Sequence, residues 1–398
     1  MKRCFRSADI LLPNTKEMEK WSVIACDQHT SDPGYWLAVR DFVGKSLSTL
    51  NYILPEAELA AATDNTIVAI NENMVKALKN ESFTVYPNSY IYVERTLVDG
   101  SVRQGIVGMV DLEDYHYFYG ENVKLCATEE TVLERIPPRA KIRRNAPLEF
   151  SHIILFCDDP ECTIVEGVAA GKEQLTKLYD FDLMMDGGHI TGWLVSGAVA
   201  EQLEAALDAY ERSSFYTVSD GNHSLVTAKR CYEERRDGAE YQEGDPCRYA
   251  MVELENINSP AIVFEPIHRL LTGVNAEKLL ADMAAISDPA GVPIPWTSGE
   301  KSGVFCLKAN GGEMTVATLQ SFLDRWLKDN AGEIDYVHGD DTVCKLADSN
   351  DKIGFVLPKP GRVEMFAHIM TGKALPRKTF SLGHACEKRY YLEGRKIR

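Results

Sequence analysis

The turn Asp220-Gly221-Asn222-His223-Ser224 limits the possible folds of this chain more than any other feature. An apolar, β-prone run from Phe215 to Val218 precedes it, and a helix-like segment from Leu225 to Arg235 follows. This order predicts a strand, a tight glycine turn and a helix N-terminus. The first amide groups of a helix have no partners within it, and the helix dipole is positive there. The turn therefore suits an anion such as phosphate.

Two side chains of the turn suit chemistry as well as binding. Asp220 is a candidate ligand for Mg²⁺ or a hydroxyl group, and His223 is a candidate to pair with a phosphate oxygen or move a proton. The structural alternative stays open, because Asp and Asn near a helix start are commonly caps and Gly is commonly a turn residue.

Glu129 is the candidate general base. It stands in Thr128-Glu129-Glu130-Thr131, just before four arginines at 135, 139, 143 and 144. A carboxylate among arginines suits proton transfer beside an anion site, since Arg binds phosphate through two hydrogen bonds. The alternative is a capping box followed by a solvated basic helix.

Two further segments offer positive charge. Pro266-Ile267-His268-Arg269 places two cationic donors at a strand end, with an ordinary surface pair as the alternative. The segment Leu375-Pro376-Arg377-Lys378-Thr379-Phe380-Ser381 is rich in Lys and Arg within an acidic chain, which suits phosphate or carboxylate. The alternative here is a solvated basic tail.

Charge and cysteine usage narrow the function classes. The chain of 398 residues has 59 acidic and 43 basic residues, a net charge of −16. This balance argues against nucleic acid or an anionic membrane as the main partner. No apolar run approaches the length of a transmembrane helix. Ten cysteines without a Cys-x-x-Cys pair predict reduced thiols in a cytoplasmic protein.

Helical and strand patterns alternate along the chain. An Asp-Gly turn at 98–101 predicts a hairpin of strands at 90–97 and 102–110. Helices are expected at 33–49, 56–80, 161–178, 197–212, 275–285 and 316–330, and further strands at 153–157, 192–196, 250–254, 261–264 and 353–357. This order predicts an α+β fold with mixed sheets and packed helices in two lobes.

The boundary between the lobes is expected in the Pro-rich, charged stretch 136–147. It would separate an N-terminal α+β lobe at 1–145 from a C-terminal α+β lobe at 146–398 that carries the Asp220 turn. A second candidate joint lies at Pro289 to Gly303, with a surface loop inside the second lobe as its alternative.

The chain resembles, over nearly its whole length, the bacterial and archaeal proteins of domain-of-unknown-function family 1015. The resemblance rests on six motifs that occur in the same order: Ile24-Ala25-Cys26-Asp27-Gln28, Gly105 to Leu112, Glu129-x-Thr131, the Asp220 turn, Pro266-Ile267-His268-Arg269 and Leu375-Pro376-Arg377-Lys378-Thr379-Phe380. The glycine turn is also similar to the phosphate-binding box of partition-protein-B-like and sulfiredoxin-like domains and of free-serine kinases.

That second resemblance implies a nucleotide-binding core of the same kind in the second lobe. It implies that Asp220, Gly221, Asn222 and His223 bind phosphate, that Glu129 accepts a hydroxyl proton, and that an adenine nucleotide and Mg²⁺ are cofactors. Two positions depart from the usual pattern: Thr128 stands where His is usual, and Ser224 where Arg is usual. Lys378, Arg377 or Arg269 would then supply the missing charge, and Ser224 and His268 complete the predicted binding set.

These features together predict a phosphotransferase that acts on a small polar metabolite, with serine or phosphoserine implied by the resemblance. Two alternatives remain. One is a non-catalytic protein that binds a nucleotide or an anionic metabolite, and the other is a phosphohydrolase of the phosphoserine type. The expected partners are a metabolite and a nucleotide, without nucleic acid or membrane, and the oligomeric state is left open.

Overall fold

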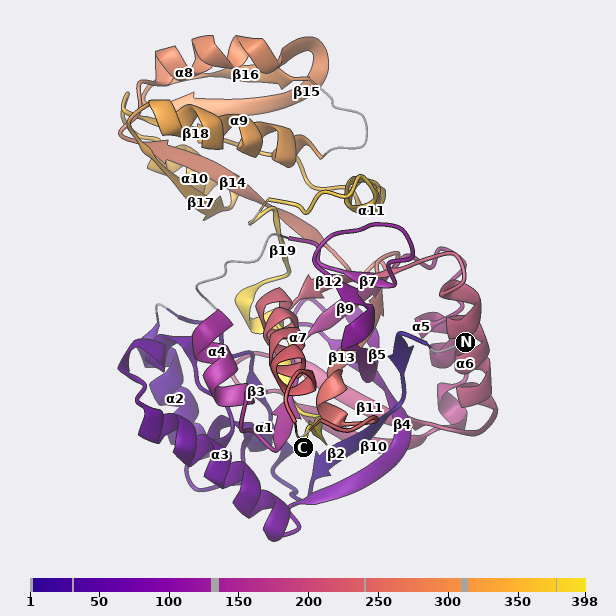
Figure 1. The fold of residues 1–398 in the computed structure, drawn as a ribbon. Coiled ribbons are helices and arrows are strands. Elements are labelled where there is room, and N and C mark those ends of the chain that lie inside the picture. The colour runs from indigo at the N-terminus through magenta and orange to yellow at the C-terminus, as the bar shows by residue number, and fades with distance from the viewer. Residues whose placement is uncertain (1–2, 31, 130–135, 240, 309–313, 377) are drawn as a thin grey trace.

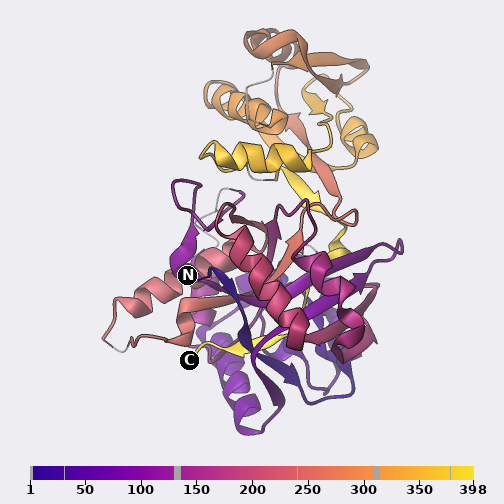
Figure 2. The ribbon, with the colours of Figure 1, turned by 90° about the vertical axis from the view of Figure 1, so that its right-hand side faces the viewer.

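The fold is α+β, as the sequence predicts, and it has two lobes stacked end to end (Figures 1 and 2). The computed structural model describes residues 3–30, 32–129, 136–239, 241–308, 314–376 and 378–398. We call residues 264–382 the small lobe and the remainder the large lobe. The chain enters the small lobe through one long strand and leaves it through a short one, and both described ends of the chain lie in the large lobe.

The large lobe is built on one extended mixed sheet. Its thirteen strands in the described residues are β1 (Phe5–Arg6), β2 (Ala8–Pro13), β4 (Phe83–Thr96), β5 (Val102–Asp111), β6 (Tyr115–His116), β7 (Leu125–Cys126), β8 (Leu148–Phe150), β9 (Ile154–Cys157), β10 (Thr176–Asp182), β11 (His189–Val195), β12 (Tyr216–Asp220), β13 (Tyr249–Asn256) and β21 (Gly394–Lys396). The main path runs β6-β7-β12-β9-β13-β5-β4-β2-β21-β8. Strand β12 pairs in parallel with β7 and antiparallel with β9.

Helices cover both faces of this sheet. They are α1 (Met18–Trp21), α2 (Pro33–Val43), α3 (Asp64–Lys79), α4 (Ile136–Arg143), α5 (Val165–Ala170), α6 (Gly197–Tyr210) and α7 (Asn222–Arg236). Side chains alternate between the faces of a strand. Tyr92 and Val252 accordingly join the core under α5, α6 and α7, while Val93 and Met251 join the core under α1, α2 and α3.

A separate two-stranded sheet joins β3 (Val23–Ile24) to β20 (Tyr390–Tyr391). It brings together residues from opposite ends of the sequence, and Trp21 Nε1 donates a hydrogen bond of 2.9 Å to the Leu392 carbonyl, 371 residues away. The segment that leads into β20 therefore lies inside the large lobe, next to the start of the chain.

The small lobe has a six-stranded antiparallel sheet with four helices in the described residues. Its elements are β14 (Phe264–Thr272), α8 (Ala276–Asp282), β15 (Ser287–Ser298), β16 (Lys301–Leu307), α9 (Thr315–Asp329), β17 (Glu333–His338), α10 (Asp340–Leu346), β18 (Lys352–Phe355), α11 (Arg362–Met370) and β19 (Phe380–Leu382). Its core continues into the large lobe, where Phe156 packs edge-on against Phe264 at 5.9 Å between ring centroids.

The hairpin expected at 90–97 and 102–110 is confirmed, since β4 pairs with β5 from Ile91↔Val107 to Thr96↔Val102. Several expectations are wrong. The strand expected at 261–264 begins only at Phe264, as β14, and the helix expected at 56–80 is α-helical only from Asp64. The helix expected at 161–178 ends at Ala170, and β10 begins at Thr176 because its residues pair along β11. The stretch 289–303 is neither a joint nor a loop but most of the hairpin β15–β16.

Prolines concealed the strand β15. Proline has no N–H to donate and is confined to positions where a sheet does not need one. Strand β15 pairs with β18 only at Trp296 and Thr297. Next to this ladder Pro295 contributes only its carbonyl, which accepts a 2.9 Å hydrogen bond from the Val356 N–H just after β18.

The division into domains at residues 1–145 and 146–398 stays a prediction. Strands from both sides of it, β4, β5 and β13, lie in the same sheet, and the Asp220 turn belongs to the large lobe with them.

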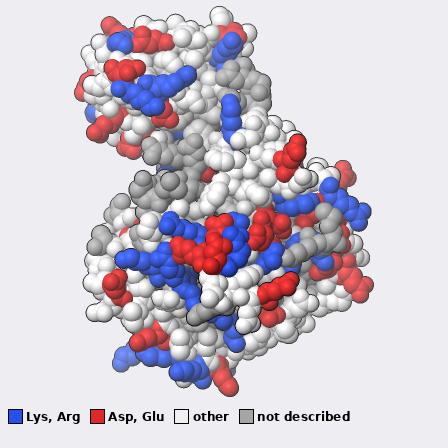
Figure 3. Space-filling view, viewed as in Figure 1, with Lys and Arg blue, Asp and Glu red and all other residues white. Residues whose placement is uncertain are grey.

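Charges of both signs are mixed on the face shown in Figure 3. Across α7, Arg144 and Arg230 both pair with Glu234, and Arg236 pairs with Glu113. The absence of a nucleic-acid partner stays a prediction. None of the helices in the described residues has both the length and the apolar character to cross a membrane. The ten cysteines all fall within the described residues, and each is a free thiol.

Candidate functional site

The Asp220 turn has the predicted structure. Strand β12 ends at Asp220, Gly221 caps the helix, and α7 begins at Asn222. Gly221 has a φ of 78°, a left-handed conformation that favours glycine, and a Cβ at this position would lie 3.0 Å from the Ile153 Cα. The N-terminus of α7 is thereby held close against the chain just before β9.

A cleft of about 520 Å³ opens above this turn, between the two lobes. That volume is in the range of small-molecule sites. The large lobe contributes Cys26, Asp27, Gln28, Thr128, Glu129, Arg139, His152, Lys388 and residues 218–224, and the small lobe contributes Ile267, Tyr336, His338, Lys378, Phe380, Ser381 and Leu382. The structure thus brings Glu129, the whole Asp220 turn and Lys378 into one cavity.

Asp220 is a charged carboxylate. Its Oδ1 accepts a hydrogen bond of 2.8 Å from the Gly221 N–H, and its Oδ2 lies 3.3 Å from Lys388 Nζ. Burial acts to raise the pKa of Asp220, but Lys388, His152 and the Gly221 N–H outweigh burial and hold the pKa below its usual value.

Glu129 is the opposite case. It is surrounded by protein yet lines the cleft, and burial is the main reason that its pKa rises to about 7, with the charge of Asp220 adding to the rise. Lys378 and the Thr379 N–H, which donates a 3.4 Å hydrogen bond to Glu129 Oε1, oppose the rise. A carboxyl group with this pKa exchanges protons readily near neutral pH.

Asn222, two residues after Asp220, holds the backbone of Glu129. Its Nδ2 donates a 3.0 Å hydrogen bond to the Glu129 carbonyl, and its Oδ1 accepts one of 3.4 Å from the Tyr115 hydroxyl. On the other side, Glu129 forms a parallel bridge with Leu375. Glu129 is therefore held between the start of α7 and the segment that carries Lys378.

Lys388 reaches the cleft because buried arginines hold its backbone. Arg95 donates hydrogen bonds of 2.7 Å to the carbonyls of both Cys386 and Lys388, and Arg103 donates one to the Glu387 carbonyl. Both arginines are buried in the large sheet. The lysine is thereby fixed by strands β4 and β5 although its own segment is irregular.

Two predicted binding residues do not reach the cleft. Arg269 is fully buried and donates hydrogen bonds to Gln320 Oε1 and to the carbonyls of Ile267 and Lys378. His268 is also fully buried, between the Leu357 N–H and Asp340. Side chains alternate along β14, so His268 and Arg269 lie on opposite faces of the small-lobe sheet. His268 contacts Asp340 of α10, while Arg269 contacts Gln320 of α9 and supports the backbone of Lys378. Arg377 lies outside the described residues.

Several lining residues were not predicted. His152 and Lys388 flank Asp220, and Cys26, Asp27 and Gln28 also line the cleft, together with Arg139 from the arginine cluster noted in the sequence. A polar run directly after a buried strand is a general sign of a site, and Asp27-Gln28 has it; His152 and Lys388 carry no comparable local signal. Burial and the neighbouring Asp27 raise the pKa of Cys26 to about 12, so its thiol stays protonated and is no nucleophile at neutral pH.

The donor set fits a phosphate group better than a metal ion alone. A helix N-terminus, Lys378 and Lys388 suit phosphate oxygens, and the buried Ser219 Oγ in the lining has no hydrogen-bond partner among the described residues. Within those same residues, no group of three or more His, Cys, Asp or Glu could hold a metal. Mg²⁺ is commonly held by one or two carboxylates together with substrate phosphates, and Asp220 provides such a carboxylate.

The sequence matches the family described as "Protein of unknown function (DUF1015)" over residues 9–350. That range covers most of the chain, and the chain belongs to this family. A search of curated proteins finds no match.

Among solved structures, similar folds include a free serine kinase crystallised as a point mutant with ADP, at a TM-score of 0.40 and 11% identity, covering 73% of this chain and 92% of that one. SbnI from Staphylococcus aureus, truncated at its C-terminus, gives a TM-score of 0.38 and 10% identity over 70% and 83% of the two chains. A conserved hypothetical protein from Pyrococcus furiosus gives 0.37 and 11% over 73% and 95%. Likeness at this level carries no argument about function.

Proposed function

We propose that this member of the DUF1015 family is a phosphotransferase that moves a phosphoryl group between an adenine nucleotide and the hydroxyl group of a small polar metabolite. The observation that supports this most is a pair of carboxylates in one cleft whose pKa values are pushed apart, Glu129 up to about 7 and Asp220 down. Such pairs mark the division between a group that moves protons and one that stays charged.

In this proposal, Glu129 is the base. The acceptor hydroxyl oxygen forms a bond to the phosphorus atom, and the bond from phosphorus to the oxygen of the leaving nucleotide breaks. The hydroxyl proton passes to the Glu129 carboxylate, and the electron pair of the broken bond stays on the leaving phosphate. Positioning and charge neutralisation supply most of the rate in this type of reaction.

The phosphates would lie over the Asp220 turn. Asn222, His223 and Ser224 at the N-terminus of α7 line this part of the cleft, and Lys378 and Lys388 line it from opposite lobes. Asp220 is the residue that would hold Mg²⁺, and the ion would neutralise phosphate charge when bound. The Asp220–Lys388 contact of 3.3 Å keeps that carboxylate ionised and oriented toward the cleft meanwhile.

Serine is the acceptor to test first, because the sequence resemblance implies it, and phosphoserine is the test for the reverse or hydrolytic reaction. A phosphohydrolase would use water at the place of the acceptor. A binding protein without catalysis would use the same turn for the nucleotide alone.

Phosphorus NMR of the purified full chain with Mg²⁺, ATP or ADP, and serine or phosphoserine separates these outcomes. We expect a new phosphorus resonance with wild-type protein and none with Glu129→Gln, while calorimetry shows that both proteins bind the nucleotide. The matched control Glu121→Gln changes an exposed carboxylate and should keep full activity. Free phosphate without an acceptor product would indicate a hydrolase. Binding without any transfer would refute the phosphotransferase proposal.

A further inference from the structure

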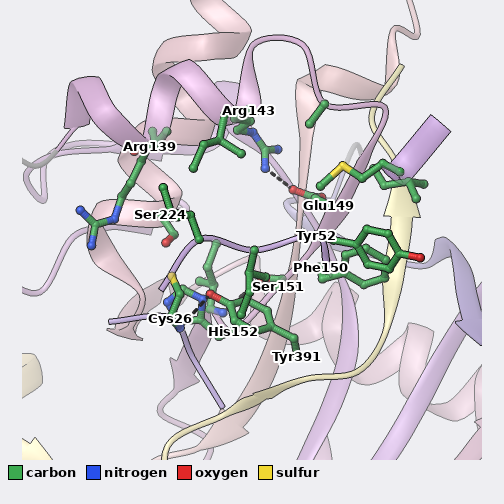
Figure 4. Close-up of a pocket in the computed structure, with 18 of the residues that line it drawn as sticks. Cys26, Tyr52, Arg139, Arg143, Glu149, Phe150, Ser151, His152, Ser224 and Tyr391 are labelled. Carbon is green, nitrogen blue, oxygen red and sulfur yellow. Dashed lines mark hydrogen bonds and ion pairs between the residues drawn. The ribbon is translucent and has the colours of Figure 1, made fainter. Parts of the chain in front are cut away.

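A second, smaller pocket opens beside the cleft, and the mechanism above does not use it. We call it the annex. It has a volume of about 150 Å³ and shares four lining residues with the cleft, namely Cys26, Arg139, His152 and Ser224 (Figure 4). Because Ser224 belongs to the first turn of α7, the mouth of the annex lies next to the place proposed for phosphate.

The wall of the annex is mostly apolar. Its apolar lining comes from three parts of the large lobe: Tyr52, Ile53, Leu54 and Leu59 before α3, Met74 in α3 with Ile142 and Ala146 in and after α4, and Leu148, Phe150 and Ile153 around β8. Tyr52 and Phe150 stack with ring centroids 5.3 Å apart, which makes this side of the pocket stiff as well as apolar. Such a surface favours apolar groups of a ligand over water.

Two acids, Glu56 and Glu149, line the annex, and protein groups hold Glu149 from several sides. Glu149 Oε1 accepts hydrogen bonds of 2.8 Å from Arg395 and from the Met251 N–H. Arg143 lies 2.5 Å from Oε2, and Figure 4 draws this ion pair as a dashed line. The arginines hold the pKa of Glu149 below its usual value although burial acts to raise it. The second acid, Glu56, pairs with Arg139 at 3.2 Å, so both carboxylates of the lining have arginine partners. The lining is otherwise mostly apolar, which favours an uncharged group.

Volume limits the size of that group. An apolar cavity of about 150 Å³ is known to hold benzene. A purine, with nine ring atoms, is larger than benzene, so the base of a nucleotide does not suit the annex. A phenyl ring or a branched alkyl group of similar size does.

We propose that the annex is the subsite for a compact apolar group on the acceptor, so that the acceptor is a hydroxyl compound with a polar end and a substituent the size of a benzene ring. The hydroxyl and the polar end would lie in the cleft by Ser224, and the apolar group in the annex. This inference rests on the proposed phosphotransferase function and names its substrate class; free serine would leave the annex empty.

Calorimetry on the full chain in the presence of Mg²⁺ and ADP tests the inference with three probes: serine, 3-phenylserine and benzyl alcohol. We expect 3-phenylserine to bind at least about 10-fold more tightly than serine, because burying a few methylene-sized groups is worth a factor of 10 or more. Ile142→Trp places a large ring at the half-buried wall of the annex and should remove this preference while ADP still binds. The control Val363→Trp alters an exposed valine of α11 and should keep the preference.

Each result bears on one claim. Equal affinity for serine and 3-phenylserine, or no binding of 3-phenylserine and benzyl alcohol, overturns the annex inference whether or not phosphate transfer to serine is seen. A preference that survives Ile142→Trp overturns it too. Loss of the preference in Ile142→Trp together with retained ADP binding supports it. Absence of phosphate transfer to every acceptor, with the annex preference intact, refutes the phosphotransferase function alone.

Discussion

The two walls of the cleft are held in different ways. On the wall of the large lobe, Asp220 closes β12 and Lys388 is fixed by arginines from the central sheet. On the wall of the small lobe, Lys378 stands in an irregular segment with a φ of 58°, supported by Arg269 from beneath and by the Leu375 bridge to Glu129. The comparison shows that Asp220 and Lys388 are fixed by the central sheet, while Glu129 lies at the junction of the two walls.

The largest expected effect is on kcat, and it should distinguish the role of Glu129 from that of Asp220. Glu129→Gln removes the base and should lower kcat by about 10² to 10⁴-fold with little change in nucleotide affinity. Asp220→Asn removes a charged group of the large-lobe wall and should act mainly on KM for Mg²⁺ and nucleotide. Steady-state kinetics with 3-phenylserine or serine as acceptor measures both. An equal loss of kcat in the two variants would contradict the division between the walls.

The next effect concerns the support of the small-lobe wall. Arg269→Gln leaves several buried hydrogen-bonding groups without a partner and should lower the free energy of unfolding by about 2 to 4 kcal/mol. Chemical denaturation measures this loss. The control Arg325→Gln changes an exposed arginine of α9 and should be nearly neutral. If Arg269→Gln proved as stable as the control, Arg269 would not be the support of the Lys378 segment.

On the large-lobe wall, Lys388→Met should weaken nucleotide binding by about 10 to 100-fold, since a charge-assisted hydrogen bond contributes roughly 1.5 to 3 kcal/mol. Calorimetric titration with ADP gives the affinity. Lys396→Met, in β21 and exposed, is the matched control. Unchanged ADP affinity in Lys388→Met would remove this lysine from the phosphate site.

The pH dependence offers a smaller but sharper comparison. Glu129 must be ionised to accept a proton, so kcat/KM should rise with pH around an inflection near 7. Lys378 lowers the pKa of Glu129 and Asp220 raises it. Lys378→Met should therefore move the inflection upward and Asp220→Asn should move it downward, each by about one pH unit or less. Shifts in the same direction would contradict the arrangement of charges.

The smallest effect is on stability. Glu129 ionises near pH 4.5 in the unfolded chain but only near pH 7 in the folded protein. The free energy of unfolding therefore falls as pH rises between these two values, stays reduced above pH 7 and is unaffected by Glu129 below pH 4.5. Glu129→Gln should raise the free energy of unfolding at pH 8 by about 1 kcal/mol, allowing for its exposure to the cleft, and leave it unchanged at pH 4.5. Denaturation at the two pH values tests this sign.

Local patterns were enough to predict the turn at Asp220, its strand and helix, and the hairpin of β4 and β5, because each depends on neighbouring residues. Glu129 and Lys378 were also proposed, and they line the same cleft as the turn. Contacts between segments far apart in the sequence could not be predicted from local patterns. The backbone around Lys388 is held by Arg95 and Arg103. Arg95 and Lys388 are 293 residues apart in the sequence. Arg269 has the charge of a phosphate ligand, yet it is buried through contacts with Gln320 and the Lys378 backbone, which no local pattern predicts.

The way β20 and β21 return to the large lobe has a consequence for biogenesis. Strand β21 lies between β2 and β8, and β20 pairs with β3. During synthesis, β2, β3 and β8 therefore lack these pairing partners until the whole small lobe has been made. Such long-range pairings slow folding and leave strand edges open meanwhile. The small lobe can fold first as an inserted unit, and Lys388 arrives with the closing strands. The nascent chain therefore completes the lining of the cleft only when its last strands are in place.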